Sequence, residues 1–393
     1  MPNYTYLIIG GGMTADAAAQ GIREGDPAGT IGLISAEPHP PYNRPPLSKG
    51  LWKGEPEESI WRKTAATGAE LHLARRALGI DVAAHTVTDD RGTVYGFRKL
   101  LLATGGTLRR LPLTSDQIIY FRTLDDYRRL RPLAQQNLRF AVIGGGFIGS
   151  EIAAALRMQG RDVVMLVPED GLGARIFPGD LSRFLVDYYR QKGVEMRMGE
   201  GMASMDMRAG NCVVRTTRSQ EVAAQVVVAG LGILPAVELA EQAGLRVDDG
   251  IVVDRFCRTS HADVYAAGDV ANFHNPSLGS RIRVEHEDNA NTMGAAAGRA
   301  MAGDKTPYTH LPFFYSDLFT LGYEAVGELD ARLETLSDWK QPFREGVIYY
   351  LKDGRVRGVL LWNTWGQVDA ARALIADRRT VRAEQLRGRL AAA

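Results

Sequence analysis

The sequence predicts an α/β fold made of two similar parallel-sheet domains and a smaller C-terminal α+β domain. One pattern occurs twice, as YLIIGGGMTADAAAQGI from Tyr6 and as RFAVIGGGFIGSEIAAALRMQG from Arg139. Each copy reads as a short buried strand, a glycine turn and an alanine-rich helix. The length of 393 residues exceeds one ordinary core. From Pro307 the sequence pattern changes to aromatic-rich strands with Asp-Gly turns, which indicates a further domain.

These patterns divide the chain into three expected domains. The first is expected over residues 1–115 and, after the segment GLGILPAVELAEQAGL returns the chain, over residues 236–306. The second covers residues 116–235, and the α+β domain covers residues 307–393. In that last domain, Asp353–Arg355 predicts a hairpin turn, and QVDAARALIADRR predicts a final helix. Trp362 and Trp365 are expected in its core.

The composition is that of an ordinary globular protein. It has 45% hydrophobic and 24% charged residues with a net charge of +1, so no nucleic-acid partner is expected. No apolar run reaches the roughly 18 residues needed to span a bilayer. The start MPNYTYLIIGGG has neither signal nor transit character. We therefore expect a cytoplasmic protein without a membrane span.

The two cysteines argue against thiol chemistry. Cys212 and Cys257 are far apart and form no CxxC pair. A disulfide scaffold, a zinc site or a dithiol redox centre is therefore not expected, and no metal site is predicted. Each cysteine is expected to be a buried apolar thiol.

The first glycine turn has the GxGxxA spacing of a dinucleotide-binding loop. Gly10 permits the tight turn, Gly12 lets the backbone approach a pyrophosphate, and the small Ala15 lets the helix pack on the strand. The helix N-terminus then faces the anion. Glu37 follows the next strand, 22 residues beyond Ala15, where a carboxylate can bind the ribose hydroxyls.

The second glycine turn repeats this arrangement with Gly144, Gly146 and Gly149. The acid candidate is Glu169, which follows the strand RDVVMLV and lies 20 residues past Gly149. A carboxylate there favours NADH because it would repel a 2′-phosphate. Arg161 and Arg175 are the alternative, because they could bind the 2′-phosphate of NADPH.

Two dinucleotide sites in one chain indicate a flavoenzyme that takes hydride from a nicotinamide. LLLATGG, from Leu100 to Gly106, and HADVYAAGDVA, from His261 to Ala271, support a flavin in the first site. Each is a strand that ends in small residues. In the second, Gly268 and Asp269 can offer a carboxylate and a helix N-terminus to the flavin, the alternative being a plain turn.

The motifs GGGMTA, RPPLSK, LLATGG, GGGFIGSE and VYAAGDVA together resemble the FAD-dependent pyridine-nucleotide oxidoreductases over nearly the whole chain. RPPLSK and GGGFIGSE narrow the resemblance to the ferredoxin reductase and apoptosis-inducing-factor branch. VPEDGLGARIFPGDL, RVEHEDNA, FFYSDLFTLGYEAVGELD and LLWN are most similar to apoptosis-inducing factor. The resemblance implies a glutathione-reductase-like flavoprotein that binds FAD and NAD(H). It excludes the disulfide reductases, which carry paired cysteines near the first helix.

The resemblance also implies roles for individual residues. Lys49 would lie near the flavin N5, paired with Glu151, and Phe147 would cover the ring face where the nicotinamide docks. His286 and Tyr315 would line the other approach to the ring. The alternatives are a surface lysine and a structural histidine. Many relatives have tryptophan where this chain has Tyr315, and asparagine where it has Ala236. The remaining implied cofactor contacts are Arg44, Ala103, Thr104, Gly105, Gly232 and Glu285.

The expected reaction is direct hydride transfer from NADH to the flavin N5, followed by electron transfer to an acceptor. The resemblance favours an apoptosis-inducing-factor-like NADH dehydrogenase that reacts slowly with oxygen and quinones and forms a homodimer on reduction. The alternative is a reductase for a ferredoxin or rubredoxin. Its basic docking patch would come from Arg281, Arg283 or the pair Arg75-Arg76. A weaker alternative is a redox-sensing interaction protein with little turnover.

Overall fold

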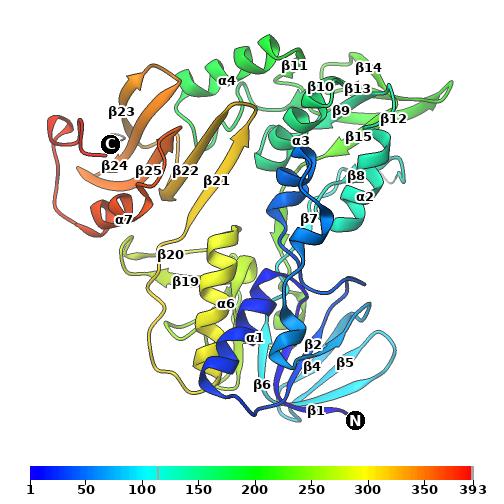
Figure 1. Ribbon diagram of the computed structural model, residues 1–393, viewed down its shortest axis with the longest axis vertical. Coiled ribbons are helices and arrows are strands. Elements are labelled where there is room, and N and C mark those ends of the chain that lie inside the picture. Colours follow the sequence, from blue (N-terminus) through cyan, green and yellow to red (C-terminus); the bar gives the residue numbers. More distant parts are fainter. Residues whose placement is uncertain (113–114, 391–393) are drawn as a thin grey trace. The chain divides into compact units, whose positions relative to one another are not determined.

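The computed structural model describes residues 1–112 and 115–390, and the chain forms two compact units (Figure 1). The first unit consists of Met1–Arg44, Pro56–Thr107 and Leu234–Phe314, and the second of Pro45–Glu55, Leu108–Ile233 and the chain from Tyr315. The second expected domain and the C-terminal α+β segment therefore share one unit. The RPPLSK loop is divided, because Arg44 belongs to the first unit and Pro45 to Lys49 belong to the second.

The first unit is built on a seven-stranded sheet. β1, β2, β3, β6 and β18 are parallel, β5 pairs with β6 in the antiparallel direction, and β4 pairs with β5 in the antiparallel direction. Residues such as Leu7 and Ile8 of β1 are fully buried, as expected for parallel strands covered on both faces. The strands, in sheet order, are β3 (Glu70–His72), β2 (Ile31–Ile34), β1 (Asn3–Ile9), β6 (Val94–Leu102), β5 (Thr86–Asp89) and β4 (Ala77–Asp81), with β18 (Val264–Ala266) also on β6.

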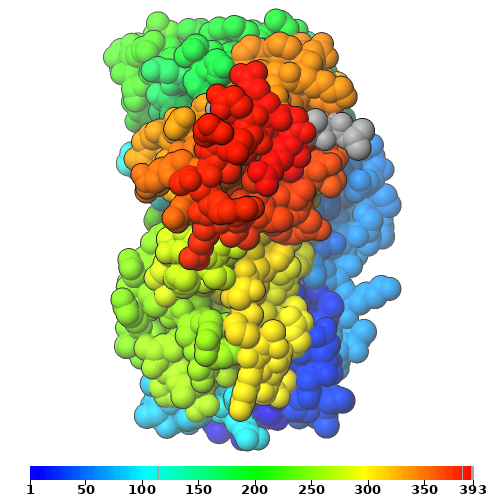
Figure 2. Space-filling view, turned by 90° about the vertical axis from the view of Figure 1, so that its left-hand side faces the viewer, coloured from blue at the N-terminus to red at the C-terminus, as the bar shows by residue number. Residues whose placement is uncertain are grey.

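Two helices of this unit, α1 (Met13–Gly25) and α6 (Glu287–Met301), pack at very close range. A Cβ atom on Gly298 would lie 2.1 Å from the carbonyl oxygen of Ala18, and one on Gly21 would lie 2.2 Å from that of Ala295. Only glycine allows such an approach. The two helices lie side by side in Figure 1, and Figure 2 shows the yellow residues of α6 against blue N-terminal residues. α1 is thereby held by a helix from far along the chain.

The second unit contains a fully parallel five-stranded sheet with the helices α2 (Leu124–Leu133), α3 (Phe147–Met158) and α4 (Gly179–Gln191). α3 connects β9 to β10 and α4 connects β10 to β11, as in a Rossmann fold. The strands, in sheet order, are β11 (Val194–Met198), β10 (Asp162–Val167), β9 (Arg139–Ile143), β15 (Val226–Ala229) and β8 (Ile118–Tyr120).

The C-terminal segment of the second unit forms an antiparallel five-stranded sheet followed by α7 (Val368–Ala376). The predicted hairpin is confirmed, since Asp353 and Gly354 connect β24 to β25 with φ of 51° and 68°. Two positive φ values match the turn that Asp-Gly favours. The strands, in sheet order, are β21 (Phe313–Leu318), β22 (Leu321–Gly327), β25 (Arg355–Trp362), β24 (Glu345–Lys352) and β23 (Glu334–Gln341). The predicted α/β fold with a C-terminal α+β segment is confirmed.

The smaller elements complete the two units. Among the described residues, every helix is too short or too polar to cross a membrane. The other strands are β7 (Gly106–Leu108), β12 (Met202–Arg208), β13 (Asn211–Thr216), β14 (Glu221–Ala224), β16 (Ile233–Pro235), β17 (Ile251–Val252), β19 (Ala271–Asn275) and β20 (Ser280–Ile282), and α5 spans Glu238–Gln242. The 3₁₀ helices are η1 (Pro45–Leu47), η2 (Gly50–Lys53), η3 (Glu57–Ile60), η4 (Thr64–Thr67), η5 (Gly268–Val270) and η6 (Ala383–Gln385).

One core prediction was wrong. Trp362 is fully buried, and its Nε1 donates to the carbonyl of Phe343 at 3.0 Å. Trp365, however, is 53% exposed. It follows the end of β25, and one part of its ring lies so close to Gly322 that a Cβ there would be 2.8 Å away. The ring thus covers a glycine on one side and meets solvent on the other.

Candidate functional site

In the first glycine loop, Gly10 is tightly packed against the chain and Gly12 is not. Gly10 has φ +132°, and a Cβ there would lie 2.1 Å from the carbonyl oxygen of Ala103. At Gly12, by contrast, the nearest atoms to such a Cβ belong to Arg44 at 4.0 Å. Gly10 is therefore required by the chain itself, whereas Gly12 leaves free space in front of the start of α1. Ala15 is fully buried, as the helix-packing role requires.

The second glycine loop has the same geometry. Gly144 has φ +104°, and a Cβ there would lie 2.6 Å from the carbonyl oxygen of Gly230. A Cβ on Gly149 would lie 2.1 Å from that of Gly144. The space around Gly146 is open to at least 4 Å. Again the middle glycine of the motif faces free space, at the start of α3.

Both helices begin in a way that suits a phosphate. Gly12 and Gly146 are the N-cap residues of α1 and α3, and among the described residues no side chain caps either helix. Their first-turn N–H groups and the positive end of each helix dipole thus face the open space. The two loops fit the pyrophosphates of two dinucleotides.

The acid expected at the first ribose already has partners. Tyr42 Oη donates to Glu37 Oε2 at 2.6 Å, and Arg44 forms an ion pair with Oε1 of the same carboxylate. The Arg44 guanidinium also lies 5.3 Å from the centre of the Tyr42 ring. Burial alone would lower the pKa of Arg44, but the neighbouring Tyr42, Glu37 and Asp269 raise it. The structure thus brings Glu37, Arg44 and Asp269, three predicted cofactor contacts, into one electrostatic cluster.

The two strand ends predicted at the flavin site also converge on the start of α1. The carbonyl of Ala103 lies over Gly10, and a Cβ on Gly268, with φ +78°, would be 2.3 Å from Thr14 Oγ1. The following turn is held by the returning chain. Thr104 Oγ1 donates to the carbonyl of Ala236 at 2.8 Å, and the carbonyl of Gly105 accepts from the Ala236 N–H at 3.0 Å.

The two predicted ring contacts at the start of α6 have local partners. Glu285 pairs with Arg283 at 2.5 Å. His286 is the N-cap residue of α6, and its ring stacks on Phe314 with centroids 4.5 Å apart.

The arginines predicted for a basic docking patch have local partners. Arg283 is bonded to Asp249, to Glu285 and to the carbonyl of Asp269. Arg281 donates to Asn272 and to the carbonyl of Val253, and Arg75 pairs with the buried Asp89. These guanidinium groups thus have partners within their own unit, and their part in a docking patch stays a prediction.

The second unit contains a buried charged cluster around Glu151, whose side chain is 3% exposed. Lys49 Nζ donates to Glu151 Oε1 at 2.7 Å. Ser316 Oγ donates to the same oxygen at 2.5 Å, and Ser48 Oγ donates to Oε2 at 2.6 Å. The Lys49 ammonium lies 5.2 Å from the centre of the Tyr315 ring. The predicted partners Lys49, Glu151 and Tyr315 are therefore brought together.

Local structure explains how Lys49 reaches Glu151. The two prolines open the short helix η1, and the N–H groups of Ser48 and Lys49 donate to the carbonyls of Pro45 and Pro46. Fixed proline φ angles favour this tight turn. Glu151 lies one turn into α3, beyond Phe147, the first residue of that helix. The prolines and the helix thus aim two consecutive donors, Ser48 and Lys49, at one carboxylate.

Sequence reasoning missed two serines and two tyrosines of this cluster. Ser48 is adjacent to Lys49 in RPPLSK, and Ser316 lies in the aromatic-Ser-Asp-Leu stretch, but nothing local to either stretch shows that they meet. Burial raises the pKa of Tyr189 and Tyr323 well above the usual value, and the charge of Glu151 raises both further. Both phenols therefore stay neutral beside the carboxylate.

The residues predicted to select between NADH and NADPH are also resolved. Glu169 and Arg175 form an ion pair at 3.4 Å near the end of β10. Arg161 instead donates to the carbonyls of Gln136 at 2.6 Å and Gln159 at 3.0 Å. Arg161 is thus used by the protein itself, which leaves Arg175 as the arginine of the NADPH alternative. Gly232, with φ +79°, lies in open space after β15.

Neither cysteine is placed for redox chemistry. Cys212 and Cys257 are both buried and free. Burial and, to a smaller extent, the charge of Asp254 together raise the pKa of Cys257 to about 12. Burial likewise raises the pKa of Cys212. Because the thiolate is the reactive form, both thiols are unreactive at neutral pH.

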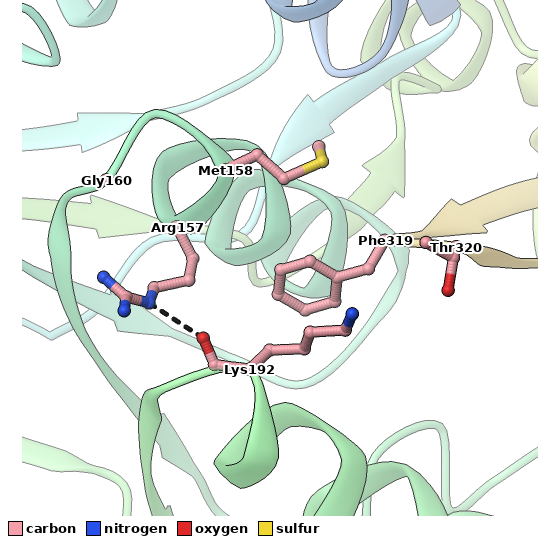
Figure 3. A pocket seen from close by; sticks show the side chains of 6 residues that line it. All are labelled: Arg157, Met158, Gly160, Lys192, Phe319 and Thr320. Atoms are coloured by element: carbon pink, nitrogen blue, oxygen red, sulfur yellow. Dashed lines mark hydrogen bonds between the residues drawn. The ribbon is translucent and has the colours of Figure 1, made fainter.

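A shallow pocket of about 300 Å³ lies where α3 and α4 end (Figure 3). Its lining residues are Arg157, Met158, Gly160, Lys192, Phe319 and Thr320. Arg157 Nε donates to the carbonyl of Lys192 at 2.8 Å, so its charge balances the C-terminal end of α4. The Lys192 ammonium lies over the Phe319 ring at 5.8 Å. These cations compensate two helix ends, and we assign the pocket no ligand.

Two family models match the chain. The model described as pyridine nucleotide-disulphide oxidoreductase matches residues 4–294. The model described as apoptosis-inducing factor, mitochondrion-associated, C-terminal, matches residues 297–342 and 337–377. Together they cover both glycine loops and the C-terminal sheet.

Curated relatives fall into two groups. The chain is 33% identical to apoptosis-inducing factor 1, mitochondrial, from Dictyostelium discoideum, over 96% of this chain and 79% of that protein. It is also 33% identical to the ferredoxin reductase subunit of 5,5'-dehydrodivanillate O-demethylase from Sphingobium sp., over 98% of this chain and 96% of that protein.

Solved structures resemble the whole chain. The covalent putidaredoxin reductase–putidaredoxin complex matches with a TM-score of 0.90 and 29% identity, over 98% of this chain and 95% of that one. A ferredoxin reductase from Rhodopseudomonas palustris matches with a TM-score of 0.89 and 29% identity, over 97% and 96%.

Proposed function

Because the chain belongs to the pyridine nucleotide-disulphide oxidoreductase family, we propose that its two glycine loops hold FAD and NADH and that it passes electrons to a small iron–sulfur protein. It is an FAD-dependent NAD(P)H oxidoreductase. FAD supplies the redox chemistry, since it accepts hydride from a nicotinamide and can release electrons singly. The chain's own residues bind and orient the two dinucleotides.

The paired geometry of Gly12 and Gly146 carries this proposal. At each position a Cβ would enter open space at an uncapped helix N-terminus. By contrast, a Cβ on Gly10 or Gly144 in the same loops would meet a backbone carbonyl at close range. Free space is thus reserved at the two places where a pyrophosphate would approach.

We further propose the individual binding roles. The cluster of Glu37, Arg44 and Asp269 would hold the ribose, pyrophosphate and polyol of FAD. Glu169 would hold the adenosine ribose of NADH, which favours NADH over NADPH because a carboxylate repels a 2′-phosphate. Lys49, paired with Glu151, would place a positive charge beside the reacting groups.

The choice of acceptor is supported by how the relatives align. The chain covers 96% of the Sphingobium ferredoxin reductase subunit and 94% of the anthranilate 1,2-dioxygenase system ferredoxin–NAD(+) reductase component from Burkholderia cepacia. It covers 79% and 63% of two apoptosis-inducing factors. The chain therefore matches the ferredoxin reductases over more of their length.

A second candidate is an apoptosis-inducing-factor-like NADH dehydrogenase with slow oxygen and quinone reactivity. The C-terminal apoptosis-inducing-factor model, which matches residues 297–342 and 337–377, favours it. In that case reduction by NADH would be followed by slow reoxidation, and a homodimer would form on reduction. A cytoplasmic location is retained for both candidates.

Anaerobic titration tests the proposal. The purified protein should be yellow and should bleach on addition of NADH. Fast cytochrome c reduction that depends on added ferredoxin supports the first candidate. A stable long-wavelength band, slow reoxidation and a mass increase to the dimer in light scattering support the second. A colourless protein that rebinds no FAD would exclude both.

A further inference from the structure

The carboxylate of Glu151 has more hydrogen-bond partners than its ion pair requires. Lys49 Nζ and Ser316 Oγ both donate to Oε1, at 2.7 and 2.5 Å. Ser48 Oγ donates to Oε2 at 2.6 Å. Each oxygen thus has a hydroxyl donor that is independent of the lysine, inside a site where the carboxylate is 3% exposed.

The three donors differ in their freedom to move. Ser316 is fully buried in β21, and Ser48 is 6% exposed in the turn before η2. Their side chains are short, so their hydroxyls stay near Glu151. Lys49 has a long side chain that is 14% exposed, and its ammonium also lies 5.2 Å from the centre of the Tyr315 ring. Of these three donors, the ammonium can move furthest from the carboxylate, because the lysine side chain has four rotatable bonds and each serine side chain has one.

The ion pair is thus surrounded by two pairs of sequence neighbours. Ser48 and Lys49 approach from one segment, and Tyr315 and Ser316 from another. In each pair one residue holds the carboxylate by a hydroxyl. The other residue either carries the ammonium, as Lys49 does, or places an aromatic ring against it, as Tyr315 does. The charge of Glu151 also raises the pKa of Tyr189 and Tyr323. However, Tyr189 Oη donates to the carbonyl of Ser150 at 3.0 Å, and Tyr323 is hydrogen-bonded to Ser316.

A buried carboxylate that loses its partners is costly, because its desolvation is no longer compensated. Two remaining hydroxyls reduce that cost. We propose that Ser316 is a positioning residue, which lets the Lys49 ammonium leave Glu151 and turn toward a bound cofactor while the carboxylate keeps a hydrogen bond on each oxygen. This inference rests on the proposed function, in which Lys49 acts at the cofactor.

The test begins on the cofactor-free protein, with the Lys49 ammonium followed by nitrogen-15 NMR and assigned by its loss in Lys49→Met. In Ser316→Ala the lysine keeps its hydrogen bond to Oε1 without competition from the Ser316 hydroxyl. Hydrogen exchange of its ammonium should therefore slow by about tenfold, the usual worth of a charged hydrogen bond. Ser316→Thr keeps the hydroxyl and should restore the exchange rate. Thr364→Val, which removes a buried hydroxyl bonded to the carbonyls of Gly346 and Trp362, is the matched control.

The FAD-bound protein gives the second readout. Ser316→Ala should slow reduction by NADH by about tenfold without raising the KM for NADH. In a Glu151→Gln background the same substitution should change neither rate, because the carboxylate charge that holds the lysine is gone. Ser48→Ala should act in the same direction as Ser316→Ala and replaces it if that variant does not fold.

The inference is overturned if the Lys49 ammonium exchanges faster or equally fast in Ser316→Ala. It is also overturned if Ser316→Ala only lowers the melting temperature, as Thr364→Val would. If the wild-type protein is not reduced by NADH, the proposed function fails, but the exchange measurement still decides whether Ser316 releases Lys49.

Discussion

Lys49 and Glu151, 102 residues apart in the sequence, form an ion pair of 2.7 Å in which the carboxylate is almost fully buried and the ammonium is partly exposed. The difference in burial matters, because an ammonium on a long side chain can reach water when its partner is lost. A carboxylate that is 3% exposed cannot.

We therefore predict that Lys49→Met destabilises the cofactor-free protein more than Glu151→Gln does. Removal of the lysine leaves a buried charge that keeps only its two serine donors, so the loss should be about 3 kcal/mol, the lower end for a broken buried ion pair. Removal of the carboxylate charge leaves an ammonium that reaches solvent and should cost about 1 kcal/mol. Urea unfolding of both variants measures the two losses.

The double variant Lys49→Met/Glu151→Gln is the control, since it removes both charges together. It should recover at least half of the stability lost in Lys49→Met. Equal losses in the two single variants would contradict the unequal burial of the pair.

The glycines of the second loop should separate binding from folding. Gly146→Ala places a methyl group in open space, so the protein should fold with an unchanged melting temperature. The KM for NADH should rise at least about tenfold, because the methyl group occupies the approach of the pyrophosphate. Gly144→Ala should instead lose stability by about 1–3 kcal/mol, since its φ is positive and its Cβ meets a carbonyl.

The equivalent glycine of the first loop should affect FAD in place of NADH. Gly12→Ala should weaken FAD retention, measured by flavin release on gel filtration, and should leave the stability of the cofactor-free protein unchanged. If Gly146→Ala and Gly12→Ala both left cofactor binding intact, the open spaces at these glycines would not be the pyrophosphate sites.

Asp89 should contribute to acid sensitivity. Burial alone would raise its pKa, but hydrogen bonds from Tyr95, Thr93 and Arg91 and the charge of Arg75 lower it. A lowered pKa in the folded state means stability that is present above the unfolded pKa of about 4 and is lost as the pH falls toward the folded value. The unfolding free energy should therefore fall more steeply with decreasing pH in the wild type than in Asp89→Asn. The difference in slope should be at most that of one proton, about 1.4 kcal/mol per pH unit.

Tyr95→Phe removes the 2.8 Å hydrogen bond to Asp89 Oδ2 and keeps the aspartate. Because the pKa of Asp89 in the folded state is then lowered less, the loss of stability on acidification should be smaller than in the wild type and should end at a higher pH. Urea unfolding at a series of acidic pH values measures this. If the unfolding free energies of the wild type and Asp89→Asn fell with the same slope, the role of Asp89 would be disproved.

Thiol chemistry should be dispensable. Because both cysteines are buried and their pKa values are raised, the native protein should resist alkylation at pH 8 until it is unfolded. The variant Cys212→Ala/Cys257→Ala should keep NADH-dependent flavin reduction within about twofold of the wild type, since neither thiol takes part. If the rate of flavin reduction in the double variant fell by a larger factor than its content of bound FAD, this prediction would be refuted.

The sequence predicted the two glycine loops well because each is local. A strand, three glycine or alanine positions and a helix are adjacent along the chain, and their geometry follows from steric rules. The same holds for the Asp353-Gly354 turn, where two residues determine the backbone.

Long-range contacts were harder to predict. Ser48 and Ser316 meet Glu151 from segments more than 100 residues away, and no local pattern marks them. Arg281 and Arg283 were proposed for a docking patch, but the sequence alone does not tell which carbonyls and carboxylates of neighbouring loops bind each guanidinium. Trp365 shows the same limit, because its exposure depends on a loop that leaves the sheet.

The close packing of α1 against α6 also has a consequence for synthesis on the ribosome. The alanine-rich face of α1 is covered by Gly294 and Gly298, which are translated more than 260 residues after α1 begins. At typical elongation rates of roughly 5–20 residues per second, this interval is on the order of tens of seconds. During this time the nascent first unit lacks both α6 and the edge strand β18. We therefore expect the emerging chain to depend on chaperones that shield apolar surface until the last third of the polypeptide has left the exit tunnel.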